Sequence, residues 1–144
     1  MKQFAVKLER FIAAPRAKVY RAFLDPVVLA QWFAPEDCSV AVADVDERVG
    51  GSHRVEFIDA DGDHHTFDSV IEQLVPDERI VLTFKFHPEA EETLFIVTFR
   101  DAAGGTDLTL EHERITHMPP LDTQSVEAGW GGALRKLQAL YDKE

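Results

Sequence analysis

The change of hydrophobic period near residue 121 most constrains what this chain can fold into. From about residue 38 to residue 114, apolar and polar residues alternate in runs separated by short polar turns. This period of two is typical of antiparallel strands. Roughly residues 121–142 then carry an apolar stripe at helical spacing, made of Val126, Trp130, Ala133, Leu134, Leu137, Leu140 and Tyr141. A sheet with one apolar face must be covered, and this helix is the element long enough to cover it.

The N-terminal third predicts one strand and two short helices. Residues 3–12 alternate in the same way and form the first expected strand. Pro15 suits the start of a helix over 15–24, because its missing N–H costs nothing there. Asp25 can then cap a second short helix over 26–35, which carries Leu29, Trp32 and Phe33.

Composition limits the classes of function. The chain has 144 residues, 45% of them apolar, which suits one domain over residues 1–144 around one core. Its 26 acidic and 15 basic side chains give a net charge of -11, which argues against general nucleic-acid binding and anionic-membrane binding. No apolar run approaches the roughly 20 residues that span a bilayer, and the N-terminus lacks the apolar region of a signal peptide. We therefore expect a cytoplasmic protein without membrane insertion.

The negative charge is concentrated in one stretch. Residues 36–72 carry eleven acidic and two basic side chains. A charged run is usually a solvated face, and the alternative is an acidic docking face for a protein partner.

Four short strings, in order and at suitable spacing, carry a resemblance to one family. They are Arg10-Phe-Ile-Ala-Ala-Pro15, Asp25-Pro26 with Gln31-Trp32-Phe33-Ala-Pro35, Asp46-Glu-Arg48-Val-Gly50-Gly51, and Glu127-Ala-Gly129-Trp130. With them the chain resembles the START-like (SRPBCC) superfamily. Within it, the chain is similar to the bacterial branch related to the C-terminal domain of the heat-shock protein 90 ATPase activator. The resemblance covers nearly the whole chain.

The resemblance implies an α+β helix-grip fold. In this fold a curved antiparallel sheet of about six to seven strands has two short helices after strand 1. The long C-terminal helix lies over the concave face. Family members bind lipids, polyketides, hormones or other apolar small molecules in a cavity between sheet and helix. A few are cyclases or hydrolases, and eukaryotic relatives bind the chaperone, so the resemblance implies a binding architecture and no particular reaction.

Three glycines stand within four residues of the predicted long helix: Gly129, Gly131 and Gly132. Gly131 and Gly132 are additions to the family pattern. Each glycine costs about 1 kcal/mol relative to alanine in a helix interior, so something must require them. One explanation is a kink or close packing of the helix on the sheet. The other is room for a ligand beneath the helix, with Trp130 as one wall.

Alternation places Arg10, His53 and His112 on otherwise apolar faces. Buried polar groups need partners, so structural hydrogen bonding is one explanation. An apolar cavity with a few polar anchors is another. Histidine also suits acid–base chemistry near neutral pH, although no nucleophile motif accompanies these two.

The sequence contains no metal, cofactor or nucleophile motif that fits its context. The acidic turn 59–63 resembles a calcium loop, but Gly62 stands fourth where the EF-hand pattern needs a glycine at position six. His64 and His65 are adjacent on a predicted strand and point to opposite faces. Cys38, the single cysteine, lacks the basic neighbour or helix start that would activate it. We therefore expect no metal and no cofactor.

These observations predict an apolar or amphipathic small molecule bound between the sheet and the 121–142 helix. The 26–35 helix and the loop near 115–122 would form the entrance. The expected wall residues are Trp32, His53, Phe57, Phe84, Phe95, Val97, His112, Trp130 and Leu134, with His53 and His112 as polar anchors. Two alternatives stay open: a module that modulates a chaperone ATPase by docking through 36–72, and a cyclase or hydrolase that uses the cavity histidines. Monomer and homodimer are both open.

Overall fold

The computed structural model describes residues 2–118 and 121–142. Within them, the chain forms seven strands and three α-helices. In chain order these are β1 (Gln3–Ile12), α1 (Arg16–Ala22), α2 (Pro26–Leu29), β2 (Ser39–Val45), β3 (Ser52–Ile58), β4 (His64–Val75), β5 (Arg79–Lys85), β6 (Thr93–Ala102), β7 (Gly105–Thr116) and α3 (Thr123–Asp142).

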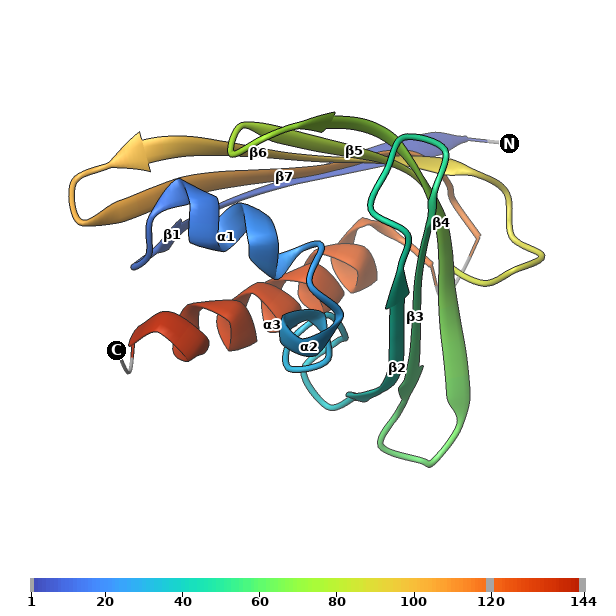
Figure 1. Ribbon diagram of the computed structural model, residues 1–144. Coiled ribbons are helices and arrows are strands. Elements are labelled where there is room, and N and C mark those ends of the chain that lie inside the picture. The colour runs from blue at the N-terminus through green and yellow to red at the C-terminus, as the bar shows by residue number, and fades with distance from the viewer. Residues whose placement is uncertain (1, 119–120, 143–144) are drawn as a thin grey trace.

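In the described part of the chain, the strands form one antiparallel sheet in the order β1-β7-β6-β5-β4-β3-β2. Strands β2 to β7 follow one another as a meander, and β1 closes the far edge against β7. Figure 1 shows that the sheet is strongly bent: β1, β5, β6 and β7 run along one side, and β2, β3 and β4 stand across them. Helix α3 crosses the concave side of this bend. The predicted α+β helix-grip fold is confirmed.

Both short helices follow strand β1 as predicted, but they are shorter than their sequence patterns. The Asp25 carboxylate accepts a hydrogen bond from the Val27 N–H at 2.9 Å, so it caps α2 as expected. Helix α2 ends at Leu29, although the sequence predicts a helix over 26–35. Beyond it the chain turns back, and the Trp32 indole N–H donates to the Ala22 carbonyl at 3.0 Å. Residues 30–35 therefore form turns that direct apolar side chains inward.

Helix α3 starts and packs as the sequence pattern predicts. The Asp122 carboxylate accepts the Ser125 N–H at 2.8 Å, and the Ser125 hydroxyl accepts the Asp122 N–H at 3.0 Å. The apolar stripe from Val126 to Tyr141 is buried, apart from Leu140, which is half-buried against the core. Among the described residues, no helix is both long enough and apolar enough to cross a membrane.

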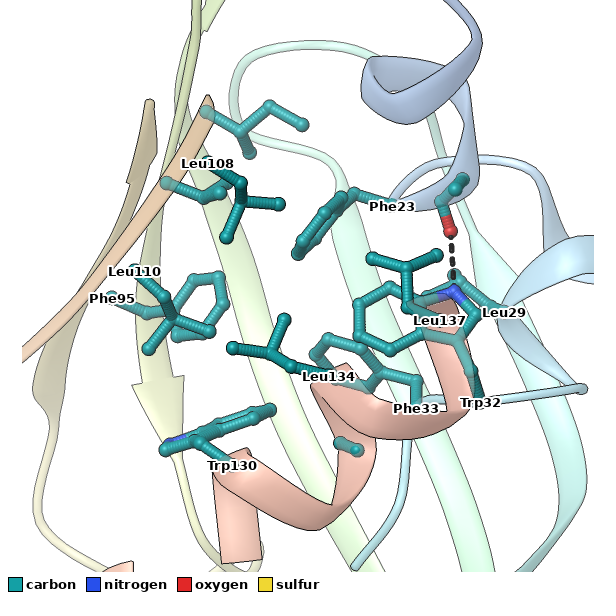
Figure 2. Packing of buried hydrophobic residues seen from close by; sticks show 14 of the residues in the cluster. Phe23, Leu29, Trp32, Phe33, Phe95, Leu108, Leu110, Trp130, Leu134 and Leu137 are labelled. Carbon is teal, nitrogen blue, oxygen red and sulfur yellow. Dashed lines mark hydrogen bonds between the residues drawn. The ribbon is translucent and has the colours of Figure 1, made fainter. Parts of the chain in front are cut away.

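One part of the concave side is solidly filled. Figure 2 shows Phe23, Leu29, Trp32 and Phe33 converging with sheet and α3 side chains. The sheet contributes Phe95, Leu108 and Leu110, and α3 contributes Leu134 and Leu137, all of which are buried. We call these nine residues together with Trp130 the packed core. It leaves the N-terminal turns of α3 as the part of the concave side that is still open.

Candidate ligand-binding pocket

A pocket with a volume of about 810 Å³ lies beside the first turns of α3. Small-molecule sites usually measure about 300–1,000 Å³, so its size is suitable. Its walls come from β3 and β4, the β5–β6 connection, the end of β7, the start of α3 and the turn before β2. The lining residues are Ala34, Pro35, Phe57, His65, Phe67, Phe86, His87, Glu89, Ala90, Glu91, Thr93, Ile115, Thr116, Met118, Leu121, Ser125, Val126, Gly129 and Trp130.

Four aromatic side chains form a continuous inner wall, which we call the aromatic wall: Phe57, Phe67, Phe86 and Trp130. Phe67 is central, with its ring centroid 4.7 Å from that of Phe57, 6.2 Å from Phe86 and 6.0 Å from Trp130. Rings have few rotatable bonds, so such a wall offers apolar contact at a low cost in conformational entropy.

A chain of hydrogen bonds holds Trp130 from behind. Its indole N–H donates to His112 Nδ1 at 3.0 Å. Because an indole can only donate, Nδ1 is unprotonated and the imidazole proton is on Nε2. Nε2 lies 2.6 Å from the Thr93 hydroxyl and donates to it, and that hydroxyl donates to the Phe84 carbonyl at 2.9 Å. Each side chain in this row of hydrogen bonds has its partners, so the hydrogen bonds fix the indole plane relative to the sheet.

Both histidines expected as polar anchors are buried outside the pocket lining. Burial lowers the pKa of His112 to about 3. Burial also lowers the pKa of His53, whose Nε2 donates to the Phe23 carbonyl at 2.8 Å. Both rings are therefore neutral at physiological pH and serve as structural hydrogen-bonding groups. This placement leaves them unable to reach a pocket ligand as acid or base.

The polar groups of the pocket lie mainly on its rim. Glu89 and Glu91 are exposed, and Glu91 accepts a hydrogen bond from the Thr116 hydroxyl at 2.7 Å. His65 stacks on Phe57 with a centroid distance of 5.1 Å, and its Nε2 lies 2.7 Å from an Asp59 carboxylate oxygen. Among the described residues that line the pocket, none is lysine or arginine.

Of the nine expected wall residues, two line the pocket: Phe57 and Trp130. The other seven are buried outside its lining: Trp32, His53, Phe84, Phe95, Val97, His112 and Leu134, each at most 2% exposed. The physical reason is that Trp32 and Phe33 fill the concave side beneath Leu134. Phe84 and Phe95 back Trp130, with ring centroids 5.7 and 5.1 Å from the indole. They support the pocket wall without forming its surface.

Sequence reasoning missed Phe67 and Phe86 as wall residues. A signal for Phe86 was present, because it continues the face of Ile80, Leu82 and Phe84 beyond the end of β5. Phe67 shares its parity with Ile71 on β4, so alternation also places it inward. The pattern does not say how far along a curved sheet the helix covers that face.

Residues from both segments that were expected to form the entrance line the pocket. Ala34 and Pro35 line one side, at the end of the 26–35 segment. Met118 and Leu121 line the other, and Met118 is 57% exposed. Pro119 and Pro120, which belong to the expected entrance loop, lie outside the described residues.

The sequence left two explanations open for the helix glycines: close packing of the helix, and space beneath it. The three glycines differ in which explanation fits them. A Cβ on Gly132 would lie 2.8 Å from the Glu36 Cβ, so close packing requires this glycine. A Cβ on Gly131 would meet Arg10 and Leu8 at ordinary contact distances of 3.7 and 3.9 Å. Gly129 lines the pocket, and a Cβ there would meet only the Pro35 ring, at 4.0 Å. Gly129 is therefore the position where the missing side chain leaves space.

The acidic segment 36–72 is partly neutralised within the chain. Three of its carboxylates pair with arginines: Glu36 with Arg135, Asp46 with Arg48, and Glu47 with Arg21. Two others pair with histidines: Glu56 with His64 and Asp59 with His65.

The 59–63 loop has the hydrogen bonds of a turn. Asp59 Oδ1 accepts the backbone N–H groups of Asp61 and Asp63, at 2.9 and 3.0 Å. The His65 hydrogen bond is the main cause of the lowered pKa of Asp59. Carboxylate oxygens of the three aspartates come within 4.8 Å of one another, but these internal bonds already account for the arrangement.

The family model described as Activator of Hsp90 ATPase homolog 1-like protein matches residues 13–142. The chain belongs to this family. A crystal structure from Chromobacterium violaceum is 35% identical, with a TM-score of 0.87 over 95% of this chain and 96% of that one. A Rhizobium leguminosarum structure is 26% identical, with a TM-score of 0.84 over 99% and 97% of the two chains. The comparison with curated proteins gives no match.

A more distant member of the comparison shares the fold alone. DynU16, a protein in the dynemicin biosynthetic locus, is 24% identical with a TM-score of 0.75 over 94% of this chain and 46% of DynU16. Membership of the Hsp90 ATPase activator homolog family confirms the resemblance drawn from the sequence strings. The family match begins after β1, yet β1 pairs with β7 along nearly its whole length, so it is an integral part of the sheet.

Proposed function

We propose that this protein binds an apolar or amphipathic small molecule in the pocket beside the first turns of α3. The observation that carries the proposal is the contrast between the two parts of the concave side. Trp32, Phe33 and Leu134 close one part completely, whereas the aromatic wall faces a space of about 810 Å³ in the other. Folding normally buries rings of this size against protein, so a wall of rings around open space suits an apolar guest.

Gly129 supports the same conclusion from the side of the helix. Alanine would be about 1 kcal/mol more favourable in a helix interior, and the space above Gly129 would accept its methyl group. The glycine thus has no packing requirement there, unlike Gly132. A glycine at this position leaves space in the pocket that a ligand can occupy.

The other two hypotheses receive less support. A cyclase or hydrolase using His53 and His112 would need these groups in the pocket, and they are neutral, hydrogen-bonded and outside its lining. Docking of a chaperone through 36–72 would rely on a segment in which five of the eleven carboxylates already contact arginine or histidine side chains of this chain.

A titration with the uncharged dye Nile red tests the proposal. We expect saturable fluorescence enhancement with a Kd of about 10 µM or tighter. Gly129→Leu should weaken binding at least about tenfold, because the leucine side chain extends into the pocket. Gly129→Ala should weaken binding by less than Gly129→Leu, because its single methyl group takes up less of the pocket.

Ala139→Leu provides the matched control, because it adds leucine to an exposed position of the same helix, outside the pocket lining. It should leave the Kd unchanged. Far-UV circular dichroism confirms that each variant is folded. The proposal fails if the wild type shows no saturable binding, or if folded Gly129→Leu binds as tightly as the wild type.

A further inference from the structure

The pocket combines a ring-lined interior with a rim whose formal charge is negative. The aromatic wall presents four rings, and Glu89 and Glu91 stand at the exposed edge on the β5–β6 connection. The remaining polar groups of the lining are the hydroxyls of Thr93, Thr116 and Ser125 and the imidazoles of His65 and His87. Thr93 is already engaged with His112 and Phe84.

A fatty acid or other anionic amphiphile lacks a counter-charge in this arrangement. Its head group would need an ammonium or guanidinium partner, and none of the described lining residues provides one. The carboxylate would instead lie near two like charges in a chain whose net charge is -11. Thr116 offers little relief, because its hydroxyl already donates to Glu91.

A positively charged group at the same place gains from both features. Glu89 and Glu91 attract it, and aromatic faces stabilise a nearby cation through their quadrupole. A neutral ring system gains the apolar contact alone. The geometry therefore points to a ranking of ligands by the charge on their polar end.

We infer that the pocket selects aromatic ligands that are neutral or carry a cationic group at the rim, and that it discriminates against carboxylates. This inference rests on the proposed function and adds the ligand class. The rings of the aromatic wall supply the affinity, and Glu89 and Glu91 determine which charge on the ligand is preferred.

Three pyrene derivatives that share one ring system test it: 1-pyrenemethylamine, 1-pyrenemethanol and 1-pyrenecarboxylate. The measurements are made at pH 8, where imidazole in water is uncharged, the amine is largely a cation and the carboxylate is an anion. At about 20 mM salt, we expect the carboxylate to bind at least about tenfold more weakly than the amine, with the alcohol between them. Raising the salt to about 300 mM should shrink this ratio, because the rim is exposed to solvent.

The double variant Glu89→Gln/Glu91→Gln removes both charges and keeps an oxygen that can accept the Thr116 hydroxyl. It should reduce the amine-to-carboxylate ratio to about threefold or less and leave the affinity for the alcohol within about twofold. The double variant Glu9→Gln/Glu78→Gln makes the same change in net charge at exposed positions outside this pocket, and it should keep most of the ratio.

The outcomes separate the inference from the proposed function. If the alcohol binds but the carboxylate binds as tightly as the amine, the charge inference is wrong and the binding function stands. The same holds if the Glu89/Glu91 variant leaves the ratio unchanged, or if the control variant lowers it equally. If none of the three compounds binds, the proposed function fails and the inference fails with it.

Discussion

His112 connects the wall of the pocket to the sheet, and both of its ring nitrogens are already hydrogen-bonded. Its Nδ1 accepts from Trp130, its Nε2 donates to Thr93, and the ring stacks on Phe86 with a centroid distance of 5.0 Å. Protonation of Nδ1 would place a donor against the indole donor and a charge in a buried site. The neutral ring is thus a condition for the position of Trp130.

The buried His112 makes stability depend on pH. Its folded pKa of about 3 lies below the ordinary histidine pKa of 6.5, so between these pH values the unfolded chain binds a proton that the folded chain does not. Stability is unaffected above about pH 6.5 and falls as pH decreases from there toward 3, by about 2 kcal/mol for this group between pH 7 and pH 5. Burial of His53 acts in the same direction.

Urea unfolding of wild type and His112→Gln at pH 7 and pH 5 measures this effect. Glutamine can accept from the indole and donate to Thr93 but does not titrate. The variant should be less stable at pH 7, yet lose about 2 kcal/mol less than the wild type on going to pH 5. Equal losses in the two proteins would contradict the prediction, since the carboxylates common to both cancel in the comparison.

Ser69 is a buried hydroxyl whose oxygen finds no hydrogen-bond partner among the described residues. It is 2% exposed and lies opposite His53 and Phe84 in the sheet register. Replacing it with alanine removes an unsatisfied polar group, so Ser69→Ala should raise the free energy of unfolding by about 1 kcal/mol. Thr106→Val is the contrasting variant, because the Thr106 hydroxyl donates to the Ala14 carbonyl at 2.7 Å. That variant should lower stability by about 1 kcal/mol in the same denaturation experiment, and a destabilised Ser69→Ala would refute the assignment.

At the scale of elements, the two halves of helix α3 contact different parts of the molecule. Its C-terminal half completes the packed core through Leu134 and Leu137, and its first turns border the pocket through Val126 and Gly129. Arg135 binds both Glu36 carboxylate oxygens, at 2.9 and 2.7 Å, and fastens the helix to the turn before β2. Lys136 donates to the Pro35 and Cys38 carbonyls in the same turn.

The helix glycines provide a paired stability test. Both Gly129→Ala and Gly132→Ala gain about 1 kcal/mol of helix propensity, so their difference reports on packing alone. Gly129→Ala should stabilise the protein by up to that amount. Gly132→Ala should destabilise it by about 1–3 kcal/mol, because the new methyl group would meet the Glu36 backbone and Cβ at 2.9 and 2.8 Å. Thermal or urea denaturation decides the matter, and equal effects at the two positions would contradict our account of the close approach.

The elements were predictable from sequence to the extent that local pattern decides them. Alternation predicted β1 with the observed bounds, and Asp25-Pro26 predicted the start of α2. The length of α2 was predicted wrongly. After Leu29 the backbone continues in turns, and the Trp32 indole bonds to the Ala22 carbonyl, a tertiary contact that no local pattern predicts. Only two of the nine expected wall residues line the pocket, since alternation identifies a face and the bend of the sheet decides which part of that face is covered.

For the molecule as a whole, charge works against compactness. The whole chain has a net charge of -11, and eleven of its 26 acidic side chains lie in residues 36–72. The ion pairs that offset part of this charge are largely exposed. Exposed pairs contribute little, whereas the excess of like charge repels throughout. Salt should therefore stabilise the protein, because it screens the repulsion between like charges more than it weakens the ion pairs.

Raising NaCl from about 20 to 300 mM should increase the free energy of unfolding by on the order of 1 kcal/mol, because screening weakens the repulsion more than the pairs. Urea denaturation at pH 7.5 measures the change, and KCl should reproduce it if the cause is ionic strength. A fall in stability would mean that the ion pairs dominate.

The placement of the two tryptophans gives this protein an intrinsic optical signal for each part of its interior. Trp32 is fully buried where α1 and α2 meet the sheet, whereas Trp130 forms part of the pocket surface. In Trp32→Phe, the remaining emission would come from the pocket alone, and its colour and its sensitivity to quenchers would report on occupancy without any added label. Since the Trp130 indole N–H is already bound to His112, an arriving guest changes the polarity around the ring rather than its hydrogen bonding, so a shift of the emission maximum would measure how dry the pocket becomes.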